Sequence, residues 1–298
     1  MKNEYCGVFA NLITSLATAD GDFDPGIMRD HVDWVVGNGV HGVSCLLGSG
    51  GFTYLTRAQR RDVIRCVVDS VRGRVKVLAG IMGETTKHTI ELGQDAIEAG
   101  ADVVVAQARS YIPLTRDEAV AHFCRVADAM SVPIGIYNHP RSTGFTISPD
   151  VYKELIDKAG AILTKDGGPD VSNVPNVTSI CGENFAYLSG HPEVMLGAFA
   201  MGADGCDVAL GSVIPKELVE LYTAACEDKD LVKAQQIFSR LLPVLQAFKR
   251  IGTPRAAKAA ARILGVASPI QPQPVLPITA DDEKLLRNAL AQANILRA

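Results

Sequence analysis

The sequence predicts an α/β fold, a (β/α)8 TIM barrel with a C-terminal helical extension, and three observations favour this fold. Eight short apolar runs alternate with longer amphipathic stretches, and several of the runs are nearly continuous in Val, Ile, Leu and Ala. Such runs are typical of parallel strands that are buried on both faces. Glycines end several of the amphipathic stretches, where a helix turns into the next strand. The 298 residues also accommodate a barrel of the usual length of about 250 residues.

The predicted strands and helices follow one another in regular order. The strands are expected at residues 7–13, 42–47, 75–81, 102–106, 133–137, 161–165, 186–188 and 205–210. Helices are expected between them, for example at residues 24–37, 56–71, 85–99, 116–130, 148–158 and 192–201. Thr115 precedes a first turn with two acidic residues, and Ser148 precedes a proline, so both are predicted to begin helices. Gly100 and Gly202, each in Gly-Ala-Asp, are predicted to end helices in a left-handed turn.

The barrel is expected to span residues 1–214. Residues 215–298 are expected to form helices packed on it within a single structural unit, because apolar periodicity resumes on both sides of the proline-rich stretch 268–277. The competing architecture is an open, doubly wound parallel sheet. It is disfavoured because no glycine-rich turn follows the first strand.

The composition excludes several classes of function. A net charge of −4, from 29 basic and 33 acidic residues, argues against a nucleic-acid-binding surface. No apolar run approaches the roughly 18 residues that span a bilayer, and the start resembles no signal peptide, so no membrane partner is expected. The seven scattered cysteines include no CxxC pair and are expected to be reduced thiols of a cytoplasmic protein. The histidines form no HxH or HExxH, so neither a metal nor a cofactor is expected.

A lysine at the end of the sixth predicted strand is the first candidate for chemistry. Lys165 ends an apolar run and precedes the pair Gly167-Gly168. The carboxyl ends of barrel strands carry the active site, and burial there disfavours the charged amine. A neutral amine can attack a ketone and form a Schiff base. The alternative is a lysine that caps a strand and points into solvent.

A tyrosine and a glycine-rich turn accompany this lysine. Tyr137 ends the preceding strand, where its phenol could transfer protons beside the imine carbon, or could simply be hydrogen-bonded at a strand end. After the second strand the chain reads Gly48-Ser49-Gly50-Gly51. Backbone amides of such a turn can hold a carboxylate, although a plain strand-to-helix turn has the same composition.

Together these motifs resemble the dihydrodipicolinate synthase / N-acetylneuraminate lyase family of class I aldolases over nearly the whole chain. The resemblance rests on Tyr137-Asn138-His139-Pro140 with Thr143-Gly144, on Lys165, on Gly100-Ala101-Asp102 followed by Tyr111, and on Gly202-Ala203-Asp204-Gly205. It implies a barrel, a pyruvate-like Schiff base and a homotetramer built as a dimer of dimers. It also implies Lys165 as the imine lysine, Tyr137 as the proton shuttle and Ser49 as the link to Tyr111, which would act in a neighbouring subunit. Gly48, Ser49 and Gly50 would hold the carboxylate of the 2-oxo acid.

The sequence departs from the family pattern at three places near the expected site. The turn Gly48–Phe52 lacks the motif's glutamate. Ser142 stands where dihydrodipicolinate synthases have the arginine for the distal carboxylate, and Arg141 is one place off. Asp207 stands where the family usually has an apolar residue in the eighth strand. The expected contacts of the distal part of the substrate are therefore His139, Arg141, Ser142, His191 and Asp207, although Asp207 is equally compatible with a structural role.

The predicted function is a Schiff-base-forming lyase that acts on a 2-oxo acid. The reaction would be pyruvate-type aldol cleavage or condensation, or dehydration of a 2-keto-3-deoxy sugar acid, since both use the iminium as an electron sink. Two alternatives remain open at this point. One is a deaminating hydrolase acting on a cyclic imine acid, and the other is a barrel that binds a small molecule without catalysis.

Overall fold

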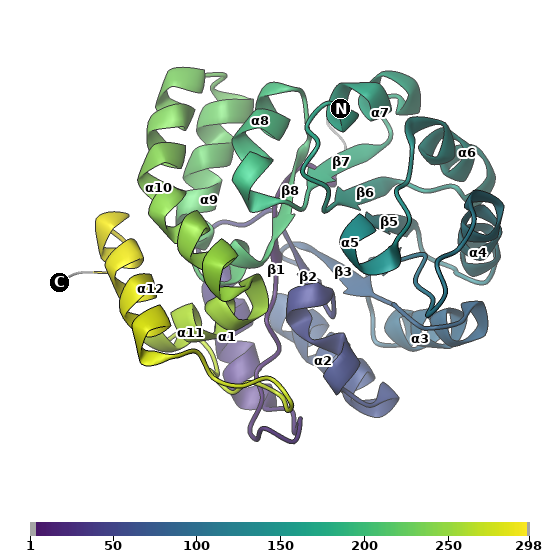
Figure 1. Ribbon diagram of the computed structural model, residues 1–298. Helices are drawn as coiled ribbons and strands as arrows, with labels where there is room; N and C mark the ends of the chain where they lie inside the picture. The colour runs from purple at the N-terminus through teal and green to yellow at the C-terminus, as the bar shows by residue number, and fades with distance from the viewer. Residues whose placement is uncertain (1–3, 297–298) are drawn as a thin grey trace.

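The computed structural model describes residues 4–296 and forms a closed barrel of eight parallel strands, with β1 paired to β8 (Figure 1). The predicted fold class is confirmed. Each strand lies within its predicted run or extends one residue past it. The strands are β1 (Gly7–Asn11), β2 (Gly42–Cys45), β3 (Lys76–Gly80), β4 (Val103–Ala106), β5 (Ile134–Asn138), β6 (Leu163–Asp166), β7 (Ala186–Ser189) and β8 (Gly205–Val208).

Helices surround the barrel and differ from the prediction at three places. Residues 192–201 form a 3-10 turn at Pro192–Val194 before the helix begins. The short helix Pro140–Thr143 lies where no helix is expected. The third difference is the helix Asn173–Cys181, which is not expected either. That helix contains a proline and several β-branched residues, so the local sequence does not favour it, but it buries Val174 and Val177. The barrel helices are α1 (Pro25–Gly37), α2 (Arg57–Val71), α3 (Thr86–Glu98), α4 (Arg116–Asp128), α5 (Pro140–Thr143), α6 (Pro149–Ala159), α7 (Asn173–Cys181), α8 (Met195–Ala200) and α9 (Pro215–Tyr222).

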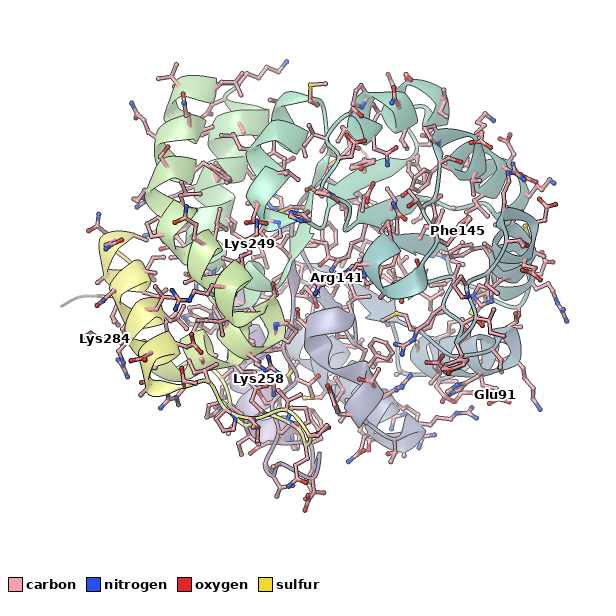
Figure 2. All side chains as sticks on the ribbon, in the orientation of Figure 1. Glu91, Arg141, Phe145, Lys249, Lys258 and Lys284 are labelled. Carbon is pink, nitrogen blue, oxygen red and sulfur yellow. The ribbon has the colours of Figure 1, made fainter. Side chains whose placement is uncertain are left out.

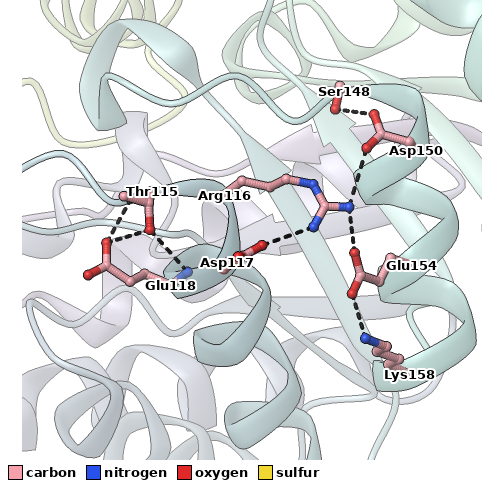
Figure 3. A network of polar contacts seen from close by, with 8 residues as sticks. All are labelled: Thr115, Arg116, Asp117, Glu118, Ser148, Asp150, Glu154 and Lys158. Atoms are coloured by element: carbon pink, nitrogen blue, oxygen red, sulfur yellow. Dashed lines mark hydrogen bonds and ion pairs between the residues drawn. The ribbon is translucent and has the colours of Figure 1, made fainter.

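The two predicted helix starts behave differently (Figure 3). At the start of α4 the Thr115 hydroxyl accepts from the Glu118 amide, and the Glu118 carboxylate accepts from the Thr115 amide, which completes a capping box. Ser148 makes no such bond to the first turn of α6. Its hydroxyl instead donates to the Asp150 carboxylate at 2.5 Å, so the predicted helix start at Ser148 is confirmed without a side-chain bond to the backbone of the first turn.

The C-terminal part continues the hydrophobic core of the barrel. After α9, which packs on β1, a π-helical turn leads to α10 (Leu231–Ile251), α11 (Thr253–Leu264) and α12 (Ala280–Gln292). These three helices lie together on one side of the barrel (Figure 1). One continuous core cluster extends from Tyr5 to Ala293. The boundary at residue 214 stays a prediction.

A buried lysine ties the C-terminal segment to the loop that follows β1. The Lys258 ammonium on α11 donates to the carbonyl of Thr14 at 2.8 Å and to that of Ile270 at 2.7 Å. Ser268 donates to the carbonyl of Leu16 in the same loop. Residues 268–273 therefore lie beside the N-terminal loop at the rim of the barrel (Figure 1). Among residues 4–296, no helix is long and apolar enough to cross a membrane.

Candidate active site

The structure brings Lys165 and Tyr137 together inside the barrel. They are register partners on the paired strands β6 and β5, so their side chains leave the sheet on the same face. The Lys165 Nζ lies 5.0 Å from the centre of the Tyr137 ring, and the two residues are only 2% and 8% exposed. Burial lowers the pKa of the Lys165 amine and raises the pKa of the Tyr137 hydroxyl. Burial thus shifts both groups toward their neutral forms.

Two cavities border this pair at the rim of the barrel. Cavity A has a volume of about 240 Å³, and its lining includes Gly48, Ser49, Tyr137, Ser142 and Lys258. Cavity B has a volume of about 690 Å³, and its lining includes Arg141, Gly167, Gly190, His191 and Lys249. His139 lines both cavities.

Lys165 itself lines neither cavity, and its neighbours are Tyr137, which lines cavity A, and Gly190, which lines cavity B. A methyl group added to Gly190 would lie 3.0 Å from the carbonyl oxygen of Asp166 and 3.1 Å from the Lys165 Cγ, so a larger residue would crowd the lysine. A methyl group added to Gly48, on the cavity A side, would lie 3.6 Å from the Tyr137 hydroxyl. Small residues thus surround the two reactive groups on both sides.

The glycine-rich turn after β2 is held by its own backbone and by a threonine. The N–H of Gly50 donates to the carbonyl of Leu47 at 2.9 Å, and the Thr14 hydroxyl donates to the Gly50 carbonyl at 2.6 Å. The predicted cradle across Gly48, Ser49 and Gly50 is therefore left with the amides of Gly48 and Ser49. Ser49 and Tyr137 line the same cavity, but within residues 4–296 no hydrogen bond joins them.

A hydrogen-bonded chain that the sequence did not predict crosses cavity A. The buried Gln107 amide, just after β4, donates to the Ser142 hydroxyl at 3.0 Å. That hydroxyl lies 2.8 Å from Nδ1 of His139, whose ring packs edge-on against the ring of Tyr137. Burial and the nearby Lys165 lower the pKa of His139, so this histidine is neutral at neutral pH. Gln107 and Ser142 thereby fix the orientation of a neutral imidazole between the two cavities.

Cavity B carries basic side chains. Arg141 is exposed and lies near the centre of the view in Figure 2, and it forms no ion pair with another residue of the described part of the chain. Lys249, on α10, pairs with Glu193 at 2.9 Å. Nδ1 of His191 is buried and has no hydrogen-bond partner within residues 4–296. Arg141 and His191 thus remain available to a polar group of a ligand.

Asp207 does not lie where a distal contact is expected. It is fully buried on β8 and lines neither cavity. Its Oδ1 lies 3.4 Å from the Lys165 Nζ and accepts a hydrogen bond of 2.7 Å from the Ser44 hydroxyl. The expectation that it contacts the distal part of a substrate is therefore corrected, since its partner in the structure is the lysine itself.

A second buried aspartate holds the strand that carries the lysine. Asp166 follows Lys165 and accepts four hydrogen bonds. The donors are the side chains of Asn138, Asn173 and Tyr187 and the backbone N–H of Gly168. These donors come from β5, β7, α7 and the next loop, so they fix the end of β6 on both sides. No sequence pattern indicates this role, because the donors are scattered along the chain.

Tyr111 lies apart from the site of its own barrel. It is 97% exposed in the loop between β4 and α4, and it lines neither cavity. Its neighbour Ile112 is 72% exposed. Within a single chain, therefore, Tyr111 cannot touch Tyr137 or Ser49.

The donor groups of the site suit covalent chemistry better than metal binding. The described residues 4–296 contain no group of three or more His, Cys, Asp or Glu side chains placed to hold a metal ion. What the site does contain is an amine whose pKa is lowered by burial, a phenol beside it, and the glycine-rich turn of Gly48 and Ser49 in the lining of cavity A. This combination fits a carbonyl compound that also bears a carboxylate.

Comparison with known proteins gives one family for the whole chain. The model of the dihydrodipicolinate synthetase family matches residues 4–293. The 4-hydroxy-tetrahydrodipicolinate synthase of Bartonella tribocorum is 32% identical over 96% of this chain and 98% of its own, and that of Methanocaldococcus jannaschii is 30% identical over 97% and 99%. The crystal structure of dihydrodipicolinate synthase from Aquifex aeolicus superposes with a TM-score of 0.93 at 28% identity, over 98% of this chain and 99% of that one. A prophage protein of the dihydrodipicolinic acid synthase family from E. coli, in complex with pyruvate, superposes with a TM-score of 0.92 at 29% identity over the same shares.

Proposed function

Because the chain belongs to the dihydrodipicolinate synthetase family and is an enzyme of the lyase class, we propose that it forms a Schiff base between Lys165 and a 2-oxo acid. The iminium then withdraws electrons from the neighbouring carbon while a bond is broken or made there. Lys165 is the nucleophile and Tyr137 transfers protons during formation and breakdown of the carbinolamine. The carboxylate of the 2-oxo acid binds the amides of Gly48 and Ser49.

The observation that carries this proposal is the position of a buried amine 5.0 Å from a buried phenol that lines cavity A. Desolvation lowers the pKa of Lys165 and so favours the uncharged amine that nucleophilic attack requires. The pyruvate complex of the E. coli relative supports a 2-oxo acid as the ligand class. A barrel that binds without catalysis does not need such an amine, and no feature of the described residues favours a deaminating hydrolase.

The substrate class proposed is a 2-oxo acid longer than pyruvate, such as a 2-keto-3-deoxy sugar acid, in aldol cleavage, aldol condensation or dehydration. Cavity B is the larger cavity and offers Arg141 and His191 to the distal end of such a molecule. The hydroxyl of Ser142 takes part in the chain with Gln107 and His139. No guanidinium therefore occupies that position, which argues against the reaction for which the curated relatives are named.

The exposed Tyr111 supports an assembly in which subunits complete one another's sites. We propose a homotetramer, a dimer of dimers, in which Tyr111 enters the neighbouring barrel and joins Ser49 and Tyr137 in a proton relay. Mixing tests this role. Chains with Lys165→Ala and chains with Tyr111→Phe are each expected to be nearly inactive, and a mixed dimer contains one site with neither defect. Activity should partly return, and its absence after verified subunit exchange would exclude the relay in trans.

The central experiment is reductive trapping. Pyruvate and borohydride are added, the intact mass is measured, and the modified peptide is identified after digestion. One adduct on Lys165 is expected. An adduct on Lys153 or Lys158 instead, or no adduct with any 2-oxo acid of a panel, would overturn the proposed function. Turnover of the same panel then identifies the substrate.

A further inference from the structure

The buried contact between Lys165 and Asp207 is longer than a tight ion pair and leaves one carboxyl oxygen of the aspartate without a partner in the described part of the chain. Both residues are almost inaccessible, at 2% and 0% exposed, on β6 and β8. The Nζ–Oδ1 distance of 3.4 Å is longer than the roughly 2.7–2.9 Å of a tight charge-assisted hydrogen bond. The other carboxyl oxygen, Oδ2, is buried and has no partner among residues 4–296. A buried ionised carboxylate needs more donors than this.

Asp166, the next residue after the lysine, gives an internal comparison. It accepts four hydrogen bonds, so both of its carboxyl oxygens have partners. Within residues 4–296, Asp207 accepts only the bond from Ser44 and the long contact from Lys165. The strands β6 and β8, which β7 separates, thus carry buried aspartates with very different numbers of hydrogen-bond donors.

No other charged group faces the pair within the described chain. Tyr137 on β5, Cys45 on β2, Cys206 on β8 and His139 after β5 are the titratable groups around it. Burial raises the pKa of the tyrosine and of both thiols and lowers the pKa of His139. All four are therefore neutral at neutral pH, and the proton shared by Lys165 and Asp207 has no competing acceptor nearby.

We propose that Asp207 holds the proton that Lys165 gives up, so that the resting site contains a neutral amine beside a carboxylic acid. This inference rests on the proposed Schiff-base function and assigns a role to a residue outside both cavities. Desolvation favours the same arrangement, because it lowers the pKa of the lysine and raises the pKa of the aspartic acid.

The proton is returned when the imine forms. The amine attacks the 2-oxo carbon, a C–N bond forms, and one proton moves from nitrogen to the former carbonyl oxygen, which gives a neutral carbinolamine. The C–O bond then breaks and the hydroxyl leaves as water. Asp207 protonates the nitrogen, and the nitrogen passes one proton to the departing hydroxyl. The nitrogen keeps one hydrogen. The products are an iminium cation and, facing it, the Asp207 carboxylate, so the net charge of the pair does not change.

Infrared difference spectroscopy of the unmodified enzyme tests the resting state directly. When pyruvate is added, the carbonyl stretch of one protonated carboxyl group should disappear. Labelling with 13C-aspartate should shift that band, which separates aspartate from glutamate. A spectrum without a lost carboxylic-acid band, although the adduct on Lys165 forms, would overturn the inference and leave the proposed function intact. If no adduct forms at Lys165, the proposed function itself fails.

Two variants extend the test to function. In Asp207→Asn the band should be absent, and pyruvate trapping at neutral pH should slow at least tenfold. The variant has to take up a proton from solution for each iminium that forms. Its affinity for pyruvate should therefore begin to fall at a lower pH than that of the wild type as the pH is raised. Asp95→Asn is the matched control, because Asp95 is a buried carboxylate paired with Arg57, far along the chain from the site. It should retain the band and the trapping rate. Equal pH profiles for the wild type and Asp207→Asn would refute the role of Asp207.

Discussion

Deletion of one hydroxyl, in Tyr137→Phe, separates catalysis from stability in this barrel. The Tyr137 hydroxyl forms no hydrogen bond with another residue of the described chain, and the ring stays buried against His139 after the change. The free energy of unfolding should therefore change by less than about 0.5 kcal/mol. General acid–base catalysis by a placed group is worth about 10²- to 10⁴-fold. The barrier to imine formation should then rise by about 3–5 kcal/mol.

A matched tyrosine on the outer side of the same strand pair provides the control. Tyr152, on α6, is fully buried, and its hydroxyl lies 3.0 Å from the Thr164 hydroxyl on β6. Tyr152→Phe should cost about 1 kcal/mol of unfolding free energy, because it loses a buried hydrogen bond. It should leave the trapping rate within about twofold, since Tyr152 lines neither cavity.

Both variants are measured in the same two assays. Urea denaturation gives the free energy of unfolding, and borohydride trapping with pyruvate, followed by intact mass, gives the rate of imine formation. The reasoning is refuted if Tyr137→Phe traps pyruvate as fast as the wild type. It is also refuted if Tyr152→Phe loses as much activity as Tyr137→Phe, because the hydroxyl would then act only through the fold.

Three further outcomes are expected. Condensation of pyruvate with aspartate semialdehyde should be poor compared with the best substrate, because the hydroxyl of Ser142 does not replace a bidentate guanidinium; steady-state kinetics with both substrates check this. Gly167→Ala should raise KM about tenfold for substrates that reach cavity B, because the added methyl would lie 2.8 Å from the His139 ring and disturb the contact of that ring with Ser142. Gly37→Ala is the control and should leave KM unchanged, because its added methyl meets nothing within 4 Å. Burial lowers the pKa of His31 from 6.5 to about 4, so the unfolded state binds more protons than the folded state between these pH values. The free energy of unfolding of the wild type should therefore fall by about 3 kcal/mol as the pH falls from 6.5 to 4. Urea denaturation at both pH values should show a smaller loss for His31→Gln.

The positions of the strands and of the central pair could be predicted from the sequence because they depend on local patterns. Strands buried on both faces produce continuous apolar runs, and these runs mark all eight strands. Tyr137 and Lys165 end adjacent runs, and consecutive parallel strands of a barrel pair in order, so their meeting follows from the order of the runs.

The surroundings of the lysine could not be predicted, because they depend on register and on loops. Ser44 and Asp207 are 163 residues apart along the chain. Their side chains come within hydrogen-bonding distance only because the barrel closes, with β1 between their strands. The contact between Gln107 and Ser142 joins the loop after β4 to the short helix α5, and no sequence pattern specifies the path of either segment. The helix α7 was missed for the opposite reason, since burial of Val174 and Val177 overrides a sequence of weak helix formers.

Because Lys258 contributes to cavity A, this cavity is completed only late in the synthesis of the chain. Cavity A is lined by residues from the turn after β2 and also by Lys258, Gln271 and Pro272, which are more than 200 positions later in the chain. A ribosome translates every barrel strand well before it reaches these residues. The nascent barrel can therefore close its sheet while one wall of cavity A is still missing, and Lys258 joins the loop after β1 only when the last helices emerge. Binding of the proposed 2-oxo acid is therefore expected only at the end of translation, after all eight strands have been synthesised.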